Sequence, residues 1–241
     1  MFGLGTLINT AAIILGGILG GLFGKLLKER HQDSLQKACG VSVLFIAVAG
    51  VLEGMLAIEN GSLVSGRALL LVGSLALGAL VGELINLERW FERFGEWLKQ
   101  KTGNSKDARF VDGFVTASLT VCIGAMAIVG AIEDGINGNY SILLTKAILD
   151  LIIIMVMTSS LGKGCVFSAI PVFLLQGSVT ALAVLIKPLM TEAALGNLSL
   201  VGNVLIFCVG INLVWGKKVR VANLLPAIIF AAAAAFLPIT L

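Results

Sequence analysis

The sequence predicts an all-α, polytopic membrane protein with about eight transmembrane helices. Apolar residues make up 58% of its 241 residues, and charged residues only 13%. Lipid-facing helices need such a composition, whereas a soluble domain of this length does not. About 20 apolar residues cross the hydrocarbon core of a bilayer. Stretches of roughly this length lie at about 4–24, 38–58, 66–86, 112–132, 141–161, 165–187, 199–215 and 222–240.

These stretches are too long and continuous for the strands of a β-barrel, and helices satisfy their own backbone groups in lipid. We therefore expect a single integral membrane domain over residues 1–241, with the lipid bilayer as its first partner. No basic segment precedes Phe2 and no small-residue cleavage site follows the first apolar stretch. We expect that stretch to remain in the protein as a helix.

Basic residues are concentrated in alternate loops of this predicted arrangement. Fourteen of the 17 Lys and Arg residues lie in 25–37, in 87–111, at 163 and in 217–220. By the positive-inside rule these segments face the cytoplasm, so both termini are expected outside. The basic residues occupy turns and form no stripe interleaved with aromatic residues, so we expect no nucleic-acid partner.

A polar Asn-x-Ser turn followed by an apolar stretch occurs three times, at Asn60, Asn139 and Asn197. It predicts three parallel hairpin repeats at approximately 38–86, 112–161 and 165–215. Internal repeats are common in transporters, although structural membrane proteins have them too. The Asn and Ser side chains are expected to cap the helices that follow. The alternative is a ring of polar groups at the outer mouth of a pathway.

The first apolar stretch carries glycines at a spacing of four, at Gly16, Gly20 and Gly24. Such spacing makes a groove in which another helix backbone can approach closely. The groove predicts close packing within one subunit or, alternatively, a homo-oligomer formed through this helix or a helix that slides.

Residues 87–98 form an amphipathic pattern after the third apolar stretch. At helical spacing one face is apolar and aromatic, and the opposite face carries most of the charge. We expect a helix lying flat in the cytoplasmic interface, with its tryptophans at headgroup depth. The apolar face consists of Leu87, Trp90, Phe91, Phe94, Trp97 and Leu98.

Two segments resemble a known family: Gly-Thr-Leu-Ile-Asn-Thr-Ala-Ala-Ile-Ile-Leu-Gly-Gly-Ile-Leu-Gly-Gly at 5–21 and Gly-Val-Leu-Glu-Gly at 50–54. The chain is similar over its whole length to a bacterial inner-membrane family of unknown function that includes proteins called YqgA and YdfK. The resemblance implies a multi-pass protein of the bacterial plasma membrane. It implies no substrate and no catalytic residue.

Asp150 is the residue that most suggests a functional site. It lies about nine residues into the stretch 141–161, and a carboxylate at that depth usually faces a cavity or a partner. Lys146 lies one helical turn earlier and can pair with it. Leu71 and Cys208 occupy the equivalent positions of the other repeats. Two interpretations stay open: a neutralised structural ion pair, and a site for a proton or another cation.

Further candidates for an ion or solute pathway are polar residues near the outer ends of the helices or within them. Acidic residues outnumber basic ones on the outer side, which favours a cation at the entrance. Ordinary interfacial charges are the alternative. Asn9 and Gln176, like the asparagines below, could bond across helices or line a path. The remaining candidates are Glu53, Glu133, Asp134, Arg67, Asn203 and Asn212.

The sequence gives no support for an enzyme, a cofactor or a metal site. His31 is the one histidine and falls in a loop, so no histidine triad or zinc site can form in the membrane. No phosphate-binding loop motif is present. We expect a transporter or channel-like protein for an ion or small solute; the alternative is a membrane scaffold or assembly partner that transports nothing.

Overall fold

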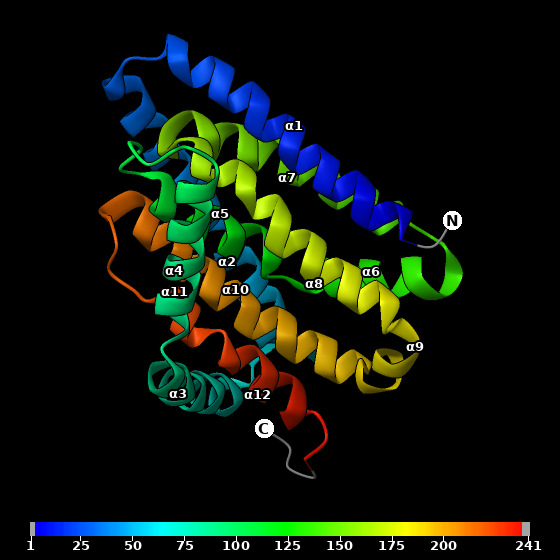
Figure 1. The fold of residues 1–241 in the computed structure, drawn as a ribbon. Coiled ribbons are helices and arrows are strands. Elements are labelled where there is room, and N and C mark those ends of the chain that lie inside the picture. The colour runs from blue at the N-terminus through cyan, green and yellow to red at the C-terminus, as the bar shows by residue number, and fades with distance from the viewer. Residues whose placement is uncertain (1–2, 238–241) are drawn as a thin grey trace.

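The computed structural model describes residues 3–237 and confirms the all-α prediction (Figure 1). Helices account for nearly every element, and the exception is one short β-hairpin. The elements are α1 (Leu4–Leu26), α2 (Glu29–Met55), β1 (Leu56–Glu59), β2 (Ser62–Ser65), α3 (Ala68–Ile85), α4 (Leu87–Lys101), α5 (Phe110–Cys122), α6 (Ala125–Asn137), α7 (Ser141–Leu161), η1 (Lys163–Ser168), α8 (Ala169–Ala181), α9 (Ala183–Ile186), η2 (Lys187–Leu189), α10 (Glu192–Trp215), α11 (Val221–Leu224) and α12 (Pro226–Ala234).

Within residues 3–237, six helical segments are long and apolar enough to cross a membrane, namely α1, α2, α3, α7, η1–α8 and α10. The pair α5–α6, bent by 62°, makes a seventh if it is one broken span. The predicted eighth stretch, 222–240, matches the shorter apolar segment Val221–Ala234, and residues 238–240 lie outside the described part. The count of eight crossings therefore stays a prediction.

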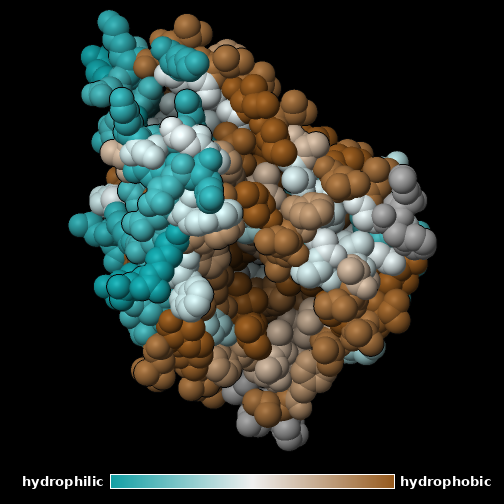
Figure 2. Space-filling view, viewed as in Figure 1, coloured by the Kyte–Doolittle hydropathy of each residue, from teal (hydrophilic) through white to brown (hydrophobic). Residues whose placement is uncertain are grey.

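The surface is divided into a polar end and a broad apolar region (Figure 2). We call the polar end the basic end; it contains 25–37, 87–111 and 217–220. Lys163 lies there too, because its neighbours Gly162 and Gly164 contact Asp107 and Phe110. Along the spans large apolar side chains face outward; Leu22 is 57% exposed and Leu84 is 86% exposed. Water would not stabilise such a surface, whereas the hydrocarbon of a bilayer would.

The β-hairpin is the main departure from the predicted elements. Helix α2 ends at Met55, and β1 pairs antiparallel with β2 across a two-residue turn at Asn60 and Gly61. Both turn residues have positive φ, 51° and 79°, as a tight hairpin of this length requires. Asn60 is therefore a hairpin turn residue, and its predicted role as a helix cap is wrong.

The other two Asn-x-Ser turns also differ from each other. Tyr140 occupies the N-cap position of α7 without a side-chain bond, and Asn139 just before it accepts hydrogen bonds from the backbone and hydroxyl of Ser141, so Asn139 shapes the turn into the helix without being its cap. Asn197 lies inside α10 and donates to the carbonyl of Ala231, so its predicted capping role is wrong. Helix α10 begins earlier, and Thr191 caps it by accepting from the backbone of Ala194.

The glycine groove of α1 is filled by α7 of the same chain (Figure 1). A Cβ on Gly16, Gly20 or Gly24 would meet the backbone of Leu151, Met155 or Ser159 respectively. Both series advance by four residues, so the two helices run parallel, and their backbones approach as closely as in other small-residue membrane interfaces.

Two further sets of helices pack antiparallel. Helix α2 lies against α10, with Gly40 beside Leu213 and Gly54 beside Leu200. Helix α3 lies against α11 and α12 in the same way. The main partner of α2 is thus not α3, which follows it in the predicted repeat. The predicted threefold repeat therefore remains a prediction from the sequence.

Helix α4 forms where the amphipathic pattern predicts a helix, and it packs on α5 at the basic end. Gly95 and Leu98 are buried, and the ring of Phe94 contacts that of Phe114 edge to face. Trp90 and Trp97 are 65% and 50% exposed. These rings are free to enter a lipid headgroup layer, as interfacial tryptophans do.

Closing the α1–α7 groove should destabilise the fold. Gly20→Ala places a Cβ against the carbonyl of Met155 and should lower stability by about 1–3 kcal/mol. Gly21→Ala is the matched control, because its Cβ would meet only Thr158 Cγ2, at 4.0 Å. Thermal unfolding in detergent measures both variants. Equal stability of the two would mean that α1 does not pack closely on α7.

Candidate functional site

A series of polar side chains runs through the interior between α1, α6, α7 and α8, from the end opposite the basic end to the middle of the spans. We call this series the polar file. Apart from Lys146, which is 8% exposed, and the half-buried Thr180, its members are at most 3% exposed. The polar file consists of Asp134, Thr6, Asn9, Lys146, Asp150, Gln176 and Thr180, the last of which contacts Thr6.

Lys146 and Asp150 form an ion pair at the end of the polar file that lies in the middle of the spans. The ammonium of Lys146 donates to both carboxylate oxygens, over 2.9 and 2.7 Å. Asp150 lies about 14 Å along α7, close to the middle of that span. Neither side chain lines either of the two cavities described below. Charge neutralisation by the partner makes this depth tolerable.

Two amides lie beside the ion pair. Asn9 of α1 lies near the Asp150 carboxylate, and its Nδ2 donates to Gln176 Oε1 of α8 over 3.2 Å. Among the described residues, Asn9 Oδ1 and Gln176 Nε2 have no hydrogen-bond partner, although both are buried. The cluster therefore has one free acceptor and one free donor, and buried polar atoms of this kind are uncommon in folded proteins.

Asp134 lies at the end of the polar file farthest from the basic end and is fully buried. Its carboxylate accepts a hydrogen bond of 2.9 Å from the backbone N–H of Gly5, in the first turn of α1. An acidic group at a helix N-terminus is favoured by the free N–H groups and the helix dipole. Nearby, Thr6 and Thr180 bring their hydroxyls to 3.4 Å from each other. Asp134 thus fixes the start of the helix that supplies Asn9.

The apolar helix pair α5–α6 is bent by 62° close to the ion pair. Helix α5 ends at Cys122, Gly124 adopts φ 146°, and α6 begins at the next residue. Cys122 lies close enough to Lys146 and Asp150 to interact electrostatically with both. A break inside a membrane frees backbone groups of both half-helices, and transporters use such breaks to bind substrates or ions.

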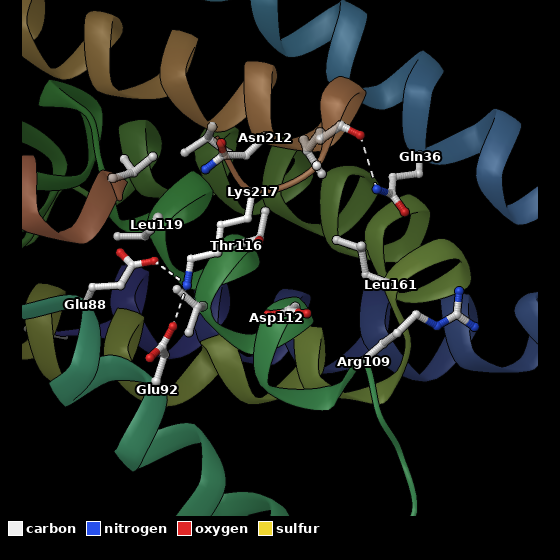
Figure 3. A pocket seen from close by; sticks show the side chains of 15 residues that line it. Gln36, Glu88, Glu92, Arg109, Asp112, Thr116, Leu119, Leu161, Asn212 and Lys217 are labelled. Atoms are coloured by element: carbon white, nitrogen blue, oxygen red, sulfur yellow. Dashed lines mark hydrogen bonds and ion pairs between the residues drawn. The ribbon is translucent and has the colours of Figure 1, made fainter. Parts of the chain in front are cut away.

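A cavity of about 220 Å³ leads from the basic end along α5 (Figure 3). Asp112 and Thr116 face it from α5, and Gln36 enters from α2. Asn212 lies at its rim, where it accepts from the backbone of Lys218 and Val219 and so shapes the turn after α10. Charged and polar side chains line its end near α4 and the start of α5, and apolar side chains, among them Val115 and Leu119, line the rest.

Lys217 crosses the mouth of this cavity towards α4 (Figure 3). Its ammonium pairs with Glu92 and, over 3.0 Å, with Glu88. Glu88 is 6% exposed and also accepts from the backbone N–H of Ala222 at the start of α11, while Asn223 accepts from the backbone of Glu88. These bonds tie α4 to α11 across the cavity mouth.

A second, apolar cavity of about 500 Å³ lies beside the break, between α5, α8, α10 and α12. Cys122, Ile123 and Gly124 form part of its wall. Ser118 also lines it, and its buried hydroxyl has no hydrogen-bond partner among the described residues. Leu119 lines both cavities, so this side chain separates the basic-end cavity from the space beside the break.

The other predicted site residues do not contact the Lys146–Asp150 pair. Glu53 and Arg67 line a surface groove beside the β-hairpin, and Arg67 reaches Gly196 of α10. Glu133 accepts from Asn137 on its own helix. Asn203 donates to Ser199 and lies against Gly50 of α2. These contacts suit local packing.

The chain matches the family described as "Protein of unknown function (DUF554)" over residues 4–236. The chain belongs to this family. The "Uncharacterized membrane protein YdfK" of Bacillus subtilis (strain 168) is 36% identical over 225 residues, 93% of this chain and 92% of that protein. The "Uncharacterized protein YqgA" of Escherichia coli (strain K12) is 29% identical over 232 residues, 95% and 94% of the two chains. No solved structure shows significant similarity.

Family membership confirms the resemblance carried by residues 5–21 and 50–54. The family match, the long apolar helices and the apolar surface together identify the chain as a membrane protein. The first of these segments contains Asn9 of the polar file and Gly16 and Gly20, which bring α1 close to α7.

The first prediction from the site concerns the buried ion pair. Asp150→Leu removes the partner of the buried Lys146 ammonium and should cost more than about 1 kcal/mol, below the roughly 3–5 kcal/mol of a fully stranded buried charge, because Lys146 can turn towards the nearby start of α7. The double change Asp150→Leu with Lys146→Leu should recover most of that loss. Asp33→Leu is the matched control: it breaks an exposed pair with Lys37 at the same spacing and should cost less than about 1 kcal/mol. Thermal unfolding in detergent would contradict the burial of the pair if the two single variants were equally stable.

The second prediction concerns the mouth of the basic-end cavity. Burial opposes the charge of Lys217, but hydrogen bonds and charges of Glu92 and Glu88 outweigh it and raise its pKa above the ordinary 10.5. A raised folded-state pKa means that the stabilisation is complete below pH 10.5 and is lost as pH rises through the raised value.

Lys217→Gln should therefore destabilise the protein at neutral pH, and the difference from the wild type should shrink above pH 10.5. Lys218→Gln, at the next position, is the control and should have little effect at either pH. Unfolding midpoints in detergent across this pH range measure both. A difference that does not change with pH would show that Lys217 acts by packing alone.

Proposed function

We propose that the protein is a transporter or channel-like protein that moves an ion or small solute across the bacterial inner membrane. The observation that carries the proposal is the broken span α5–α6. Its break lies between the cavity from the basic end and the buried polar file from the opposite end. Discontinuous helices next to polar groups near the bilayer midplane are typical binding elements of transporters.

The proposed orientation follows from the distribution of charge. The basic end would face the cytoplasm, which places the cavity along α5 on the cytoplasmic side and both termini outside. The exposed rings of Trp90 and Trp97 on α4 would then lie at the inner headgroup layer. With this orientation the cavity along α5 would open towards the cytoplasm, and the polar file would be closed on the outer side.

A specific observation favours the second candidate, a scaffold that transports nothing. Lys146 covers both carboxylate oxygens of Asp150, and neither side chain reaches the two cavities. A purely structural pair would look the same. The proposals differ in whether the boundary formed by Leu119 between the two cavities controls a flux.

Leu119→Ala should remove the side chain that separates the two cavities, open a passage between them and raise flux several-fold. Leu205→Ala on α10 is the matched control: Leu205 is fully buried, lines neither cavity, and should lose a similar amount of packing. Flux into proteoliposomes is measured for alkali cations, protons and small organic solutes. The transporter proposal fails if no solute moves faster than in protein-free liposomes and the two variants behave alike.

A further inference from the structure

We propose that Asp150 binds a proton, exchanging its bond to Lys146 for a bond to the Asn9–Gln176 amide pair. This inference rests on the proposed function, because it names the ion that the polar file would carry. It is drawn from the atoms around Asp150: two carboxylate oxygens held by one ammonium, and two amides that are only half satisfied.

The amide pair can serve Asp150 in either charge state. In the observed arrangement Asn9 Nδ2 donates to Gln176 Oε1, and the Asn9 amide lies near the carboxylate, where a donor suits an ionised Asp150. Turning both amide groups over exchanges oxygen and nitrogen atoms of nearly equal size. Gln176 Nε2 would then donate to Asn9 Oδ1, and that oxygen would face Asp150 as an acceptor for a protonated carboxyl.

The charge balance of the step is simple. The carboxylate of Asp150 takes one proton and becomes a neutral carboxylic acid, and Lys146 keeps its own proton as an ammonium. The site changes from neutral to one positive charge. Lys146 lies about 8 Å along α7 from Ser141, where the helix starts, so its long side chain can turn towards the outer surface when released.

Lys146 and the proton compete for the carboxylate of Asp150. Cys122 at the end of α5 is the other titratable side chain near the pair, and Asp134 of α6 is engaged by the backbone of Gly5. Within the described residues, α1, α2 and α8 direct no charged side chain at Asp150, and α1 and α8 contribute neutral amides.

The geometry favours a proton over a metal cation. A hard metal ion takes about six oxygen ligands, whereas a proton on a carboxyl needs one acceptor. Beside the Asp150 carboxylate, the amides of Asn9 and Gln176 are the neutral oxygen donors of the polar file at that depth, and the Lys146 ammonium fills the position of a cation. Residues 3–237 contain no metal-binding group of three or more His, Cys, Asp or Glu side chains.

Infrared difference spectra of the lipid-reconstituted protein, recorded as the pH is lowered, test the assignment. The wild type should develop the carbonyl band of a protonated carboxyl group in a buried site. The band should be absent from Lys146→Gln with Asp150→Asn, a neutral double variant of nearly unchanged shape, and present in Asp134→Asn. Asn9→Leu should move it to the frequency of an acid without an acceptor, whereas Thr6→Val should leave it in place.

The assignment is overturned if the double variant keeps the band, or if the wild type develops none over the pH range in which it stays folded. A band that sodium ions suppress at constant pH would replace the proton by a metal cation and overturn it as well. The test needs no transported solute. A flux that responds to Leu119→Ala in a protein without the band would therefore uphold transport and reject only the proton.

Discussion

The structure depends on keeping an ion pair in a place where water cannot solvate it. Lys146 and Asp150 lose their hydration inside the spans, and their mutual attraction compensates only with close geometry and further hydrogen bonds. Helix α7 provides the spacing, and Asn9 of α1 provides a neighbouring amide. Asn9 reaches that point because Gly16 and Gly20 let α1 lie directly on the α7 backbone. The glycine groove is thus a condition for the polar cluster.

The same constraint explains why the break in α5–α6 is confined to one depth. Unpaired backbone groups are costly in lipid and are tolerated where protein or a water-filled cavity surrounds them. Here α5 and α6 lie against other helices of the bundle, with a cavity on each side of Leu119. The clamp formed by Glu88, Glu92 and Lys217 joins α4 to the α10–α11 turn at the open end. Helix α5 therefore borders the cavity from the basic end, whereas α6 packs on α7, α8 and α9.

The features that the sequence predicted well are local ones. A carboxylate within an apolar run and a lysine one turn earlier identify the pair of Asp150 and Lys146 without knowledge of the fold. The contact between Asn9 and Gln176 joins residues 167 positions apart, so only the packing of α1 on α8 could establish it. The break at Gly124 was missed because apolar residues continue on both sides of it. The β-hairpin was missed because Leu56–Glu59 extends the apolar pattern of α2.

The position of the break within the predicted repeat bears on what the polar centre is for. Leu71 and Cys208 stand where the second copy has Asp150, so the hairpin element alone does not require a carboxylate there. In the second copy α7 carries the ion pair, and the span before it is the one that breaks beside the pair. A general requirement of folding would act on all three copies. Two departures that meet at one depth in one copy are what the proposed transport function would require, because a carboxylate and freed backbone groups together can bind what an apolar helix cannot.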